Sequence, residues 1–449
     1  HLVVPEKMLL PLYEKKGLGY WLTSIGLMIY DFLAAVKVNE RRMMLTRTQT
    51  FRHEPMLKKN DIKGGAIYAE YRTDDARLTI EIIKMAATHQ ADAINYVKAG
   101  DFVYDNGQIA GLQVHDELTG NRFTIRGKVV VSAAGPWVDE LRKTDRSLEG
   151  KRLHLTKGVH IVIPHDKLRV AQAIYFDVDD GRMIFAIPRG RVTYVGTTDT
   201  EYHGDKDHVT ASIEDAEYLI KAVNATFADV NLSLADIESS WAGLRPLIHE
   251  DGRSASELSR KDEIFESPTG LISIAGGKLT GYRKMAERVV NLVIRKFHPD
   301  LKGANCYTDK IPLTGYRFQS TRQVKGYIQS IAQMLMPYAV SGHTARYLVE
   351  TYGKQADLII GQFLRNLDEY EAELSLLKAE AWFCVHYEMV TGLQDFFVRR
   401  TGLLYFEIRK VIQHKLAIAV YLKSLLQWDD KKMEHELIVL DQEIREVTE

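Results

Sequence analysis

The chain has 449 residues, of which 45% are hydrophobic and 27% are charged, so it can bury the cores of two or three domains. Its 59 Lys and Arg residues nearly balance its 60 Asp and Glu residues, and a net charge of -1 excludes a whole-molecule field that attracts nucleic acid or anionic lipid. The two cysteines, Cys306 and Cys384, lie far apart, which supports neither a disulfide framework nor a zinc site and favours a reducing cytoplasm.

The first apolar stretch, residues 17–36, is long enough to span a membrane. Thr23, Ser24 and Asp31 interrupt it, whereas a spanning helix is more continuously apolar. We therefore expect a buried helix here. The chain starts at His1 without a basic region, an apolar core and a cleavage site, so we expect no secretory signal and expect a fragment of a longer protein.

A strand and a helix are predicted next, at 63–71 and 74–87, and the two acids that open the helix suit the positive end of its dipole. Short alternating segments with Asn-Gly and Thr-Gly turns predict a β-meander between residues 102 and 125. The run 128–132 is continuously apolar and β-branched. It is typical of a parallel strand covered on both faces.

Residues 153–200 form a second β-rich block with glycine turns, and they predict an antiparallel sheet. A helix is expected at 213–227. A further buried strand, 271–275, then turns at Gly276 and Gly277 into a helix with apolar residues at helical spacing.

The last part of the chain is predicted to be a separate all-helical domain from about residue 321, after a Pro- and Gly-containing linker. The clearest amphipathic stretches are 379–389 and 407–426. Within the second, residues 410–423 mix apolar and basic side chains and could rest on lipid. We expect this helix to pack inside the domain instead.

The first candidate ligand site is VVVSAAGPWVDEL at 129–141. A buried strand that ends in Ala133, Ala134 and Gly135 lets a flat ligand approach the backbone, at the strand end where open α/β sheets bind ligands. Pro136 then begins a helix. A junction built only for packing would have the same pattern.

The second candidate is IAGGKLTGYRKMAERV at 274–289. Gly276 and Gly277 permit tight backbone approach, and the helix that begins near Thr280 points amide groups and a positive dipole at its ligand. A reduced flavin, whose N1–C2=O region carries negative charge, would satisfy that end. The alternative is a glycine-rich connection without a ligand.

Basic residues accompany these turns. Arg245, in the rigid segment GLRP, could hold its guanidinium against a phosphate or carboxylate. Arg260 and Lys278 could join it, although an isolated arginine is usually a solvated surface charge. His160, in TKGVH, could take a hydroxyl proton near neutral pH, or it could be a hydrogen-bonded core residue.

Taken together, eight segments resemble, in the same order, those of the FAD-dependent glycerol-3-phosphate dehydrogenases and the related alpha-glycerophosphate oxidases. The resemblance covers nearly the whole chain, and GGKLTGYRKMAE and WAGLRPL are its most specific parts. The eight segments are YAEYRTDDARLTIE, VVVSAAGPWVDEL, TKGVHIVI, VGTTDTEYHGD, SSWAGLRPLIHEDG, ELSRKDEIFES, GLISIAGGKLTGYRKMAE and VTGLQDFFVRRTG.

The resemblance implies an α/β fold class. In this fold an FAD-binding domain of the glutathione-reductase type is interleaved with an antiparallel β-sheet substrate domain, and a C-terminal all-helical cap domain follows. We expect the FAD part at 74–150 and 241–297, the substrate part at 1–73 and 151–240, a linker at 298–320 and the cap at 321–449.

The resemblance also assigns site residues. It implies that Arg245 and Arg260 help to hold substrate and that Lys278 lies beside the flavin and the substrate, while His160 remains the candidate catalytic residue that the segment TKGVH itself suggests. It implies cofactor contacts at Ala134, Gly135, Trp137, Gly243, Gly276, Gly277, Lys278, Leu279 and Thr280.

By the same resemblance, FAD takes a hydride at flavin N5 from C2 of glycerol 3-phosphate while a base removes the hydroxyl proton, which gives dihydroxyacetone phosphate. The phosphate would use the arginine clamp, and orientation over the flavin would supply much of the rate. The electrons would pass to quinone at the inner face of the cell membrane, or to oxygen with release of hydrogen peroxide. The residues do not separate these acceptors, nor a homodimer from a monomer.

One departure from the family concerns its opening unit. The family begins with a strand, a G-x-G-x-x-G turn and a helix that holds the FAD pyrophosphate, followed by an arginine and a tyrosine of the substrate site, and nothing here matches that unit. We therefore expect the chain to lack the main FAD phosphate anchor. An inactive fragment that binds no FAD, and an oxidase of amino or hydroxy acids with the same fold, stay open as alternatives.

Overall fold

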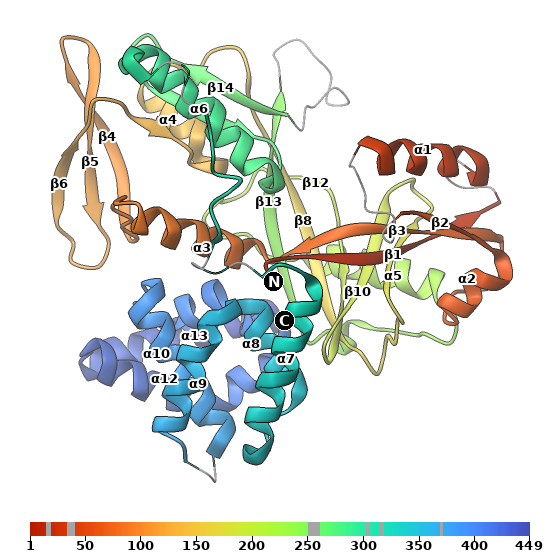
Figure 1. The fold of residues 1–449 in the computed structure, drawn as a ribbon. Helices are drawn as coiled ribbons and strands as arrows, with labels where there is room; N and C mark the ends of the chain where they lie inside the picture. The colour runs from red at the N-terminus through yellow and green to blue at the C-terminus, as the bar shows by residue number, and fades with distance from the viewer. Residues whose placement is uncertain are drawn as a thin grey trace.

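The computed structural model has three parts: a large sheet with α1 (Gly19–Leu33) and α2 (Arg47–His53), a smaller α/β part, and a bundle of helices (Figure 1). The α/β fold class with a helical C-terminal part is thus confirmed. The structure describes residues 1–14, 19–33, 41–249, 261–301, 303, 305–313, 316, 318–368 and 371–449.

The large sheet has nine strands, and most neighbours are antiparallel, as the pattern at 153–200 predicts. Apolar side chains such as Leu9, Val159 and Phe176 form its core under α5 (Ile213–Thr226), which Ser212 starts with a capping box. The strands are β1 (Val3–Tyr13), β2 (Met43–Thr46), β3 (Ile62–Thr73), β8 (Arg152–Pro164), β9 (Ala173–Asp177), β10 (Met183–Arg189), β11 (Val192–Gly196), β12 (Thr200–Glu201) and β13 (Ser239–His249).

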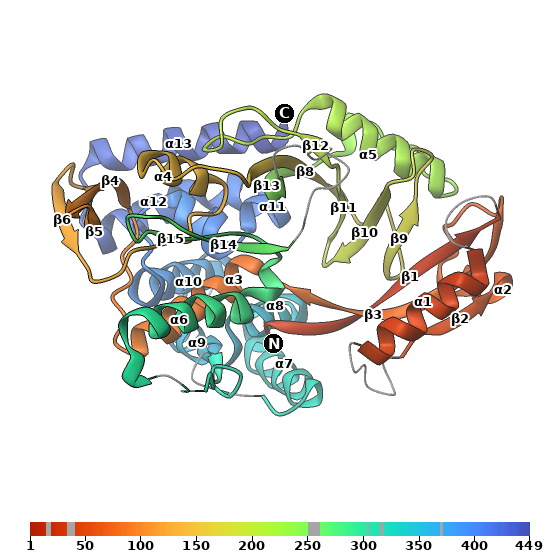
Figure 2. The same ribbon diagram turned by 90° about the horizontal axis from the view of Figure 1, so that it is seen from above.

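The smaller α/β part is built around a three-stranded sheet, which we call the small sheet. It consists of β14 (Asp262–Glu266), β15 (Ile272–Gly276) and β7 (Val131–Ser132), and it lies between α4 (Val138–Thr144) and α6 (Tyr282–Phe297) (Figure 2). The predicted buried strand at 271–275 is confirmed, because both faces of β15 are covered by apolar side chains.

The strand predicted at 128–132 is parallel to its neighbour, as expected, but the prediction that it is covered on both faces was wrong. Only Val131 and Ser132 form strand β7, and Val131 is 42% exposed. The reason is position: β7 is at the edge of its sheet and pairs only with β15 among the described strands.

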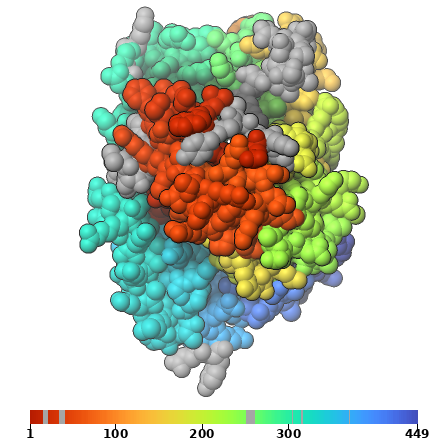
Figure 3. Space-filling model, turned by 90° about the vertical axis from the view of Figure 1, so that its right-hand side faces the viewer, coloured from red at the N-terminus to blue at the C-terminus, as the bar shows by residue number. Residues whose placement is uncertain are grey.

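The predicted burial of the first apolar helix was also wrong. Helix α1 forms, but Trp21 is 80% exposed and Phe32 is 83% exposed. The buried residues are polar: Thr23, and Asp31, which pairs with Arg42 at 3.5 Å. The helix therefore rests on the sheet through its polar edge, and no other described element covers its apolar side; the red N-terminal segment lies on the surface in Figure 3.

The β-meander and the following elements agree with the sequence pattern. Helix α3 (Asp75–Thr88) begins at the cap residue Asp74. The meander is a separate antiparallel sheet, and a short 3-10 helix, η2 (Gly135–Trp137), follows β7. Its strands are β4 (Val97–Asp105), β5 (Gln108–Asp116) and β6 (Arg122–Arg126).

The C-terminal cap is all-helical, as predicted. Helix α12 packs against α10 and α13, which confirms that it lies within the cap. The amphipathic prediction for 379–389 was wrong, because α10 is buried on most sides, with α9 and α12 packed against it. The helices are α7 (Thr321–Leu335), α8 (Gly342–Tyr352), α9 (Ala356–Arg365), α10 (Ala372–Glu388), α11 (Leu403–Phe406), α12 (Ile408–Leu426) and α13 (Asp430–Thr448), with a π-helical turn η11 at Asp395–Arg400.

No described helix is both long enough and apolar enough to cross a membrane.

Candidate active site

Two predicted site residues, His160 and Arg245, come together where β8 pairs with β13. The strands are antiparallel, with Trp241 opposite His160 and Arg245 opposite Thr156. A Cβ placed on Gly158 would lie 2.5 Å from Nη2 of Arg245, so this glycine makes room for the guanidinium. The sheet register thus brings the candidate base and the candidate anion-binding residue to one place.

The Arg245 guanidinium is anchored by the segment after β11. Its Nη1 donates to the carbonyl oxygen of Thr198 at 3.0 Å and to Oδ1 of Asp199 at 3.1 Å. Its Nη2 donates to Oγ1 of Thr197 at 3.0 Å. The side chain is still 33% exposed, so an oriented guanidinium faces open space, which suits recognition of an anion.

His160 is held in an apolar setting that keeps it neutral. Its ring stacks on Trp241 at 4.6 Å, and a Cβ on Gly196 would come within 2.2 Å of its Cδ2 atom. Burial, with a smaller effect of the Arg245 charge, lowers the pKa of His160 from 6.5 to about 4. A neutral imidazole can accept a proton at physiological pH.

The two predicted cofactor segments meet at one edge of the small sheet. Strands β7 and β15 are parallel, with Ser132 opposite Ser273, so the turns that follow them leave the same edge. Helix η2 contacts both β15 and β13. Residues 134–137 and 276–280 therefore lie side by side at the carboxyl ends of neighbouring strands, where α/β sheets bind ligands.

Three observations fit a flat, polar-edged group such as the flavin of FAD at this edge. A Cβ on Gly135, which has φ 55°, would meet no atom within 4 Å. The hydroxyl oxygen of Ser132 is buried and has no hydrogen-bond partner among the described residues. The side chains of Trp137 and Leu279 are 37% and 39% exposed, and Thr280 is exposed beside Leu279.

Gly276 and Gly277 have a second reason to be glycine. Their φ angles are 74° and 76°, in the left-handed region. A Cβ on Gly276 would lie 2.8 Å from the carbonyl oxygen of Lys261, and a Cβ on Gly277 would lie 3.0 Å from Cβ of Asp262. The turn itself thus requires both glycines, with or without a ligand.

Lys278 follows the glycine turn at the end of β15. It is exposed at the start of the 3-10 helix Leu279–Gly281. Burial raises the pKa of Glu70 on β3, and the charge of Lys278 partly offsets that rise, which indicates that the two groups are close. Gly243 is exposed in β13 with no atom within 4 Å of an added Cβ. Arg260 lies outside the described residues.

Sequence reasoning missed residues that orient the predicted ones. Thr197 and Asp199 anchor Arg245, and Trp241 stacks on His160. All three lie inside segments that carry the family resemblance, VGTTDTEYHGD and SSWAGLRPLIHEDG. Their roles have no periodic signal, because they depend on which strands pair.

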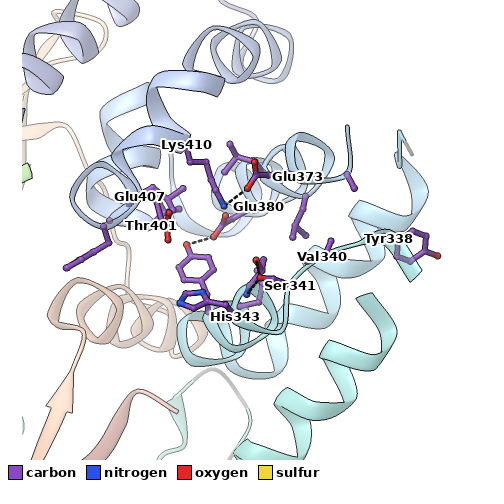
Figure 4. Close-up of a pocket in the computed structure, with 18 of the residues that line it drawn as sticks. Tyr338, Val340, Ser341, His343, Glu373, Glu380, Thr401, Glu407 and Lys410 are labelled. Carbon is purple, nitrogen blue, oxygen red and sulfur yellow. Dashed lines mark hydrogen bonds and ion pairs between the residues drawn. The ribbon is translucent and has the colours of Figure 1, made fainter. Parts of the chain in front are cut away.

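A separate cavity of about 450 Å³ lies in the cap, with Arg189 of the large sheet at its border, and none of the predicted site residues lines it. Figure 4 shows Glu380 and the Lys410–Glu373 pair on one side and His343 and Ser341 on the other. Phe406, at the end of α11, also lines it. The cavity therefore belongs to the cap and not to the candidate active site.

Two family models match the chain. The model for FAD dependent oxidoreductases matches residues 1–282. The model for the C-terminal domain of alpha-glycerophosphate oxidase matches residues 306–433.

Curated proteins and solved structures give the same result. The aerobic glycerol-3-phosphate dehydrogenase of Bacillus subtilis (strain 168) is 43% identical over 436 residues, which are 96% of this chain and 78% of that protein. The protein of that name from Staphylococcus aureus (strain USA300) is 43% identical over 99% of this chain and 81% of its own length. The glycerol-3-phosphate dehydrogenase from Bacillus halodurans complexed with FAD superposes with a TM-score of 0.85 at 40% identity, covering 100% of this chain and 83% of that chain.

Proposed function

The chain belongs to the family of FAD-dependent glycerol-3-phosphate dehydrogenases and alpha-glycerophosphate oxidases, and on that basis we propose that it oxidises sn-glycerol 3-phosphate to dihydroxyacetone phosphate. The observation that carries this proposal is the anchored, partly exposed guanidinium of Arg245 beside the neutral imidazole of His160. The guanidinium of Arg245 suits a phosphate dianion, and the imidazole of His160 suits acceptance of the proton of a secondary alcohol.

The proposed site for FAD is the edge formed by the two turns. The backbone of Ala134, Gly135 and Trp137 would lie on one side, and that of Gly276 to Thr280 on the other. FAD, when bound, supplies the acceptor for the hydride that leaves C2 of the substrate. The start of α6 points its positive dipole toward the same edge and so favours an anionic ligand there.

His160 would take the proton of the C2 hydroxyl group. At neutral pH its ring is uncharged, because burial holds the pKa at about 4. Arg245 would hold the phosphate through the guanidinium edge that its bonds to Thr197 and Asp199 leave free. Lys278 and Arg260 would add positive charge beside the substrate. Fixing the phosphate and the hydroxyl group at once orients C2, and orientation supplies a large part of the rate.

Anaerobic flavin bleaching tests this function. The chain is loaded with FAD, and the loss of the oxidised flavin band is recorded after addition of sn-glycerol 3-phosphate. We expect bleaching by this substrate and none by glycerol, which lacks the phosphate. Equal bleaching by both would contradict phosphate recognition. A protein that is colourless after incubation with FAD and removal of the unbound FAD would contradict the function for this chain.

We propose quinone as the electron acceptor. Both curated relatives described above, each 43% identical, are named dehydrogenases and not oxidases. The test compares the rate of reduction of a water-soluble quinone with oxygen uptake and hydrogen peroxide release under identical conditions. Peroxide formation at the full rate of substrate turnover would replace the quinone proposal with the oxidase alternative.

A further inference from the structure

His160 sits in an aromatic cluster that joins the large sheet to the cap. Its ring is stacked on Trp241, with centroids 4.6 Å apart and an angle of 12° between the planes. Phe185 on β10 lies 5.5 Å away on the sheet. The imidazole is thus bounded by aromatic rings and by the backbone of Gly196.

The Nδ1 atom of His160 has no hydrogen-bond partner among the described residues. In many catalytic sites, a hydrogen bond to the second ring nitrogen sets the orientation and the tautomer of the histidine. Here the plane of the ring is set by contact, with Gly196 on one side and Trp241 stacked against it.

Trp241 is in turn held by the cap. Its ring lies 5.5 Å from that of Tyr405 and 5.4 Å from that of Phe406. The hydroxyl of Ser239, two residues before Trp241, donates to the carbonyl oxygen of Tyr405. Helix α11 therefore contacts the strand that carries both Trp241 and Arg245.

Phe406 connects this cluster to the cavity. Its ring contacts Tyr194 at 5.9 Å and lies under the guanidinium of Arg189 at 3.9 Å. The same ring lines the 450 Å³ cavity in the cap. Truncation of Phe406 would enlarge existing open space, so Trp241 would lose its support without replacement.

We propose that Trp241, backed by Tyr405 and Phe406 of the cap, is a positioning residue that sets the plane of His160, so that the cap completes the active site. This inference rests on the proposed function, in which His160 accepts the substrate proton. It assigns a role in the reaction to α11, a cap element of which none of the residues is a candidate substrate or cofactor contact.

The first experiment compares Trp241→Leu with the conservative Trp241→Phe in the FAD-loaded chain. We expect Trp241→Leu to lower kcat about 100-fold with KM changed less than about 3-fold, because a misplaced base affects the chemical step. Trp241→Phe keeps a stacking ring and should retain most of kcat. Equal activity of Trp241→Leu and wild type would overturn the inference.

A second readout does not depend on activity. Histidine labelled with ¹³C at Cε1 is titrated by NMR without added FAD, and His160→Gln assigns the signal. The charged group that faces His160 is Arg245 on β13, while β10 and β11 present Phe185 and Gly196. We expect the low pKa to rise toward about 6.5 in Trp241→Leu, because the ring becomes hydrated, and to stay low in Trp241→Phe. An unchanged pKa in Trp241→Leu would contradict the contact described here.

The cap's contribution is tested with Phe406→Ala. We expect Phe406→Ala to lower kcat and to raise the pKa of His160, as Trp241→Leu does. Phe406→Leu should give values between those of wild type and Phe406→Ala. The matched control is Phe363→Leu, which removes a buried cap ring that contacts Tyr338 and not Trp241. If the control lowers kcat as much as Phe406→Ala, the effect is general destabilisation of the cap and the inference fails.

Failure of the inference can be told from failure of the proposed function. If His160→Gln leaves kcat unchanged, the base assignment is wrong whatever Trp241 does. If His160→Gln lowers kcat by at least about 100-fold while Trp241→Leu has no effect, the proposed function stands and the positioning role is rejected.

Discussion

At the scale of single residues, the candidate active site depends on side chains that neighbouring residues hold in one orientation. Arg245 is oriented by acceptors on Thr197, Thr198 and Asp199. A lysine at this position would carry the same charge. It could not donate hydrogen bonds to all three acceptors and also bind a phosphate through a planar edge. Substitution of Arg245 should therefore first remove the fixed orientation of the positively charged group.

We predict that Arg245→Lys raises KM for glycerol 3-phosphate about 10- to 150-fold, because a charge-assisted hydrogen bond contributes roughly 1.5–3 kcal/mol. Steady-state kinetics measure this change. The matched control is Arg182→Lys, whose guanidinium pairs with Asp180 on the surface and should leave KM unaltered. An equal loss of activity with phosphorylated and unphosphorylated substrates would argue for the alternative, an oxidase of amino or hydroxy acids.

His160 also makes stability depend on pH. Its folded-state pKa of about 4 is below the ordinary value of 6.5, so the unfolded chain binds more protons between these values. Its contribution is fully present above pH 6.5 and is lost as the pH falls through 4. The loss is at most about 3 kcal/mol. Urea unfolding at pH 7 and pH 4.5 should therefore give a smaller difference between wild type and His160→Gln at the lower pH.

The control for this pH effect is His203→Gln, at a side chain that is 80% exposed. A change of the same size in this variant would assign the pH effect to the loss of any histidine and not to the burial of His160. If the difference between wild type and His160→Gln is also constant, the ring is hydrated in solution and the proton-acceptor argument loses its basis.

At the scale of elements, α3 and α10 are joined by a buried ionic network. The Arg77 guanidinium makes two hydrogen bonds to Glu388, at 2.7 and 2.8 Å, and a third to Glu81 at 2.9 Å. Lys84 bonds to both acids. Although burial alone would raise it, Arg77 and Lys84 hold the pKa of Glu388 below its ordinary value. The network fixes how the cap sits on the helix that follows β3.

We predict that Glu388→Gln lowers the free energy of unfolding by about 3–5 kcal/mol, because Arg77 is left buried without its main counter-charge. The double variant Arg77→Met/Glu388→Met should be less destabilised than the sum of its two single variants. Denaturant unfolding measures both. Glu434→Gln, at an exposed position of α13, is the control and should lie within about 0.5 kcal/mol of wild type.

Helix α12 provides the second prediction at this scale. Lys410 pairs with Glu373 at 2.9 Å, and Lys415 pairs with Asp441, so both cations are directed at the cap. We therefore expect Lys410→Glu/Lys415→Glu to lower the melting temperature but to leave flotation with anionic liposomes unchanged. Reduced flotation of this variant would mean that α12 rests on lipid after all.

At the scale of the whole molecule, the cap contacts both other parts. Asn95 and Tyr96 directly precede β4 of the β-meander; Asn95 donates to the carbonyl oxygen of Met389 and Tyr96 donates to Asp395, both at 2.9 Å. On the large sheet, Arg191 pairs with Glu407 at 2.9 Å. Unfolding of the cap alone would leave these groups and the Arg77 network without partners.

We predict a single cooperative unfolding transition for the chain. Far-UV circular dichroism reports mainly the helices of the cap, whereas Trp241 fluorescence reports the sheet, and the two midpoints should coincide. Fluorescence is assigned by comparison with Trp241→Phe. Two separated transitions would show that the cap unfolds independently, and they would weaken the case that it supports the active site.

The sequence was sufficient for local structure and for the family. Period-2 and period-3.6 patterns predicted β3, α3, the β-meander, β15 and α6, because each pattern reports which face of one element is apolar. The glycine turns after β7 and β15 were predicted separately, each as a candidate ligand-binding turn, and the structure brought them together through the pairing of β7 with β15. Their adjacency followed from one parallel pairing, which is a general property of such sheets.

The tertiary structure decided what depends on contacts between distant segments. It left the apolar side of α1 exposed and buried its polar edge, because burial depends on the neighbour and not on the pattern of the helix. It buried α10 on most sides. It also placed Thr197 and Asp199 around Arg245, and it stacked Trp241 on His160. These contacts come from strand register and cap docking. No local pattern encodes them, since each joins residues that the chain brings together only after the sheets and the cap have formed.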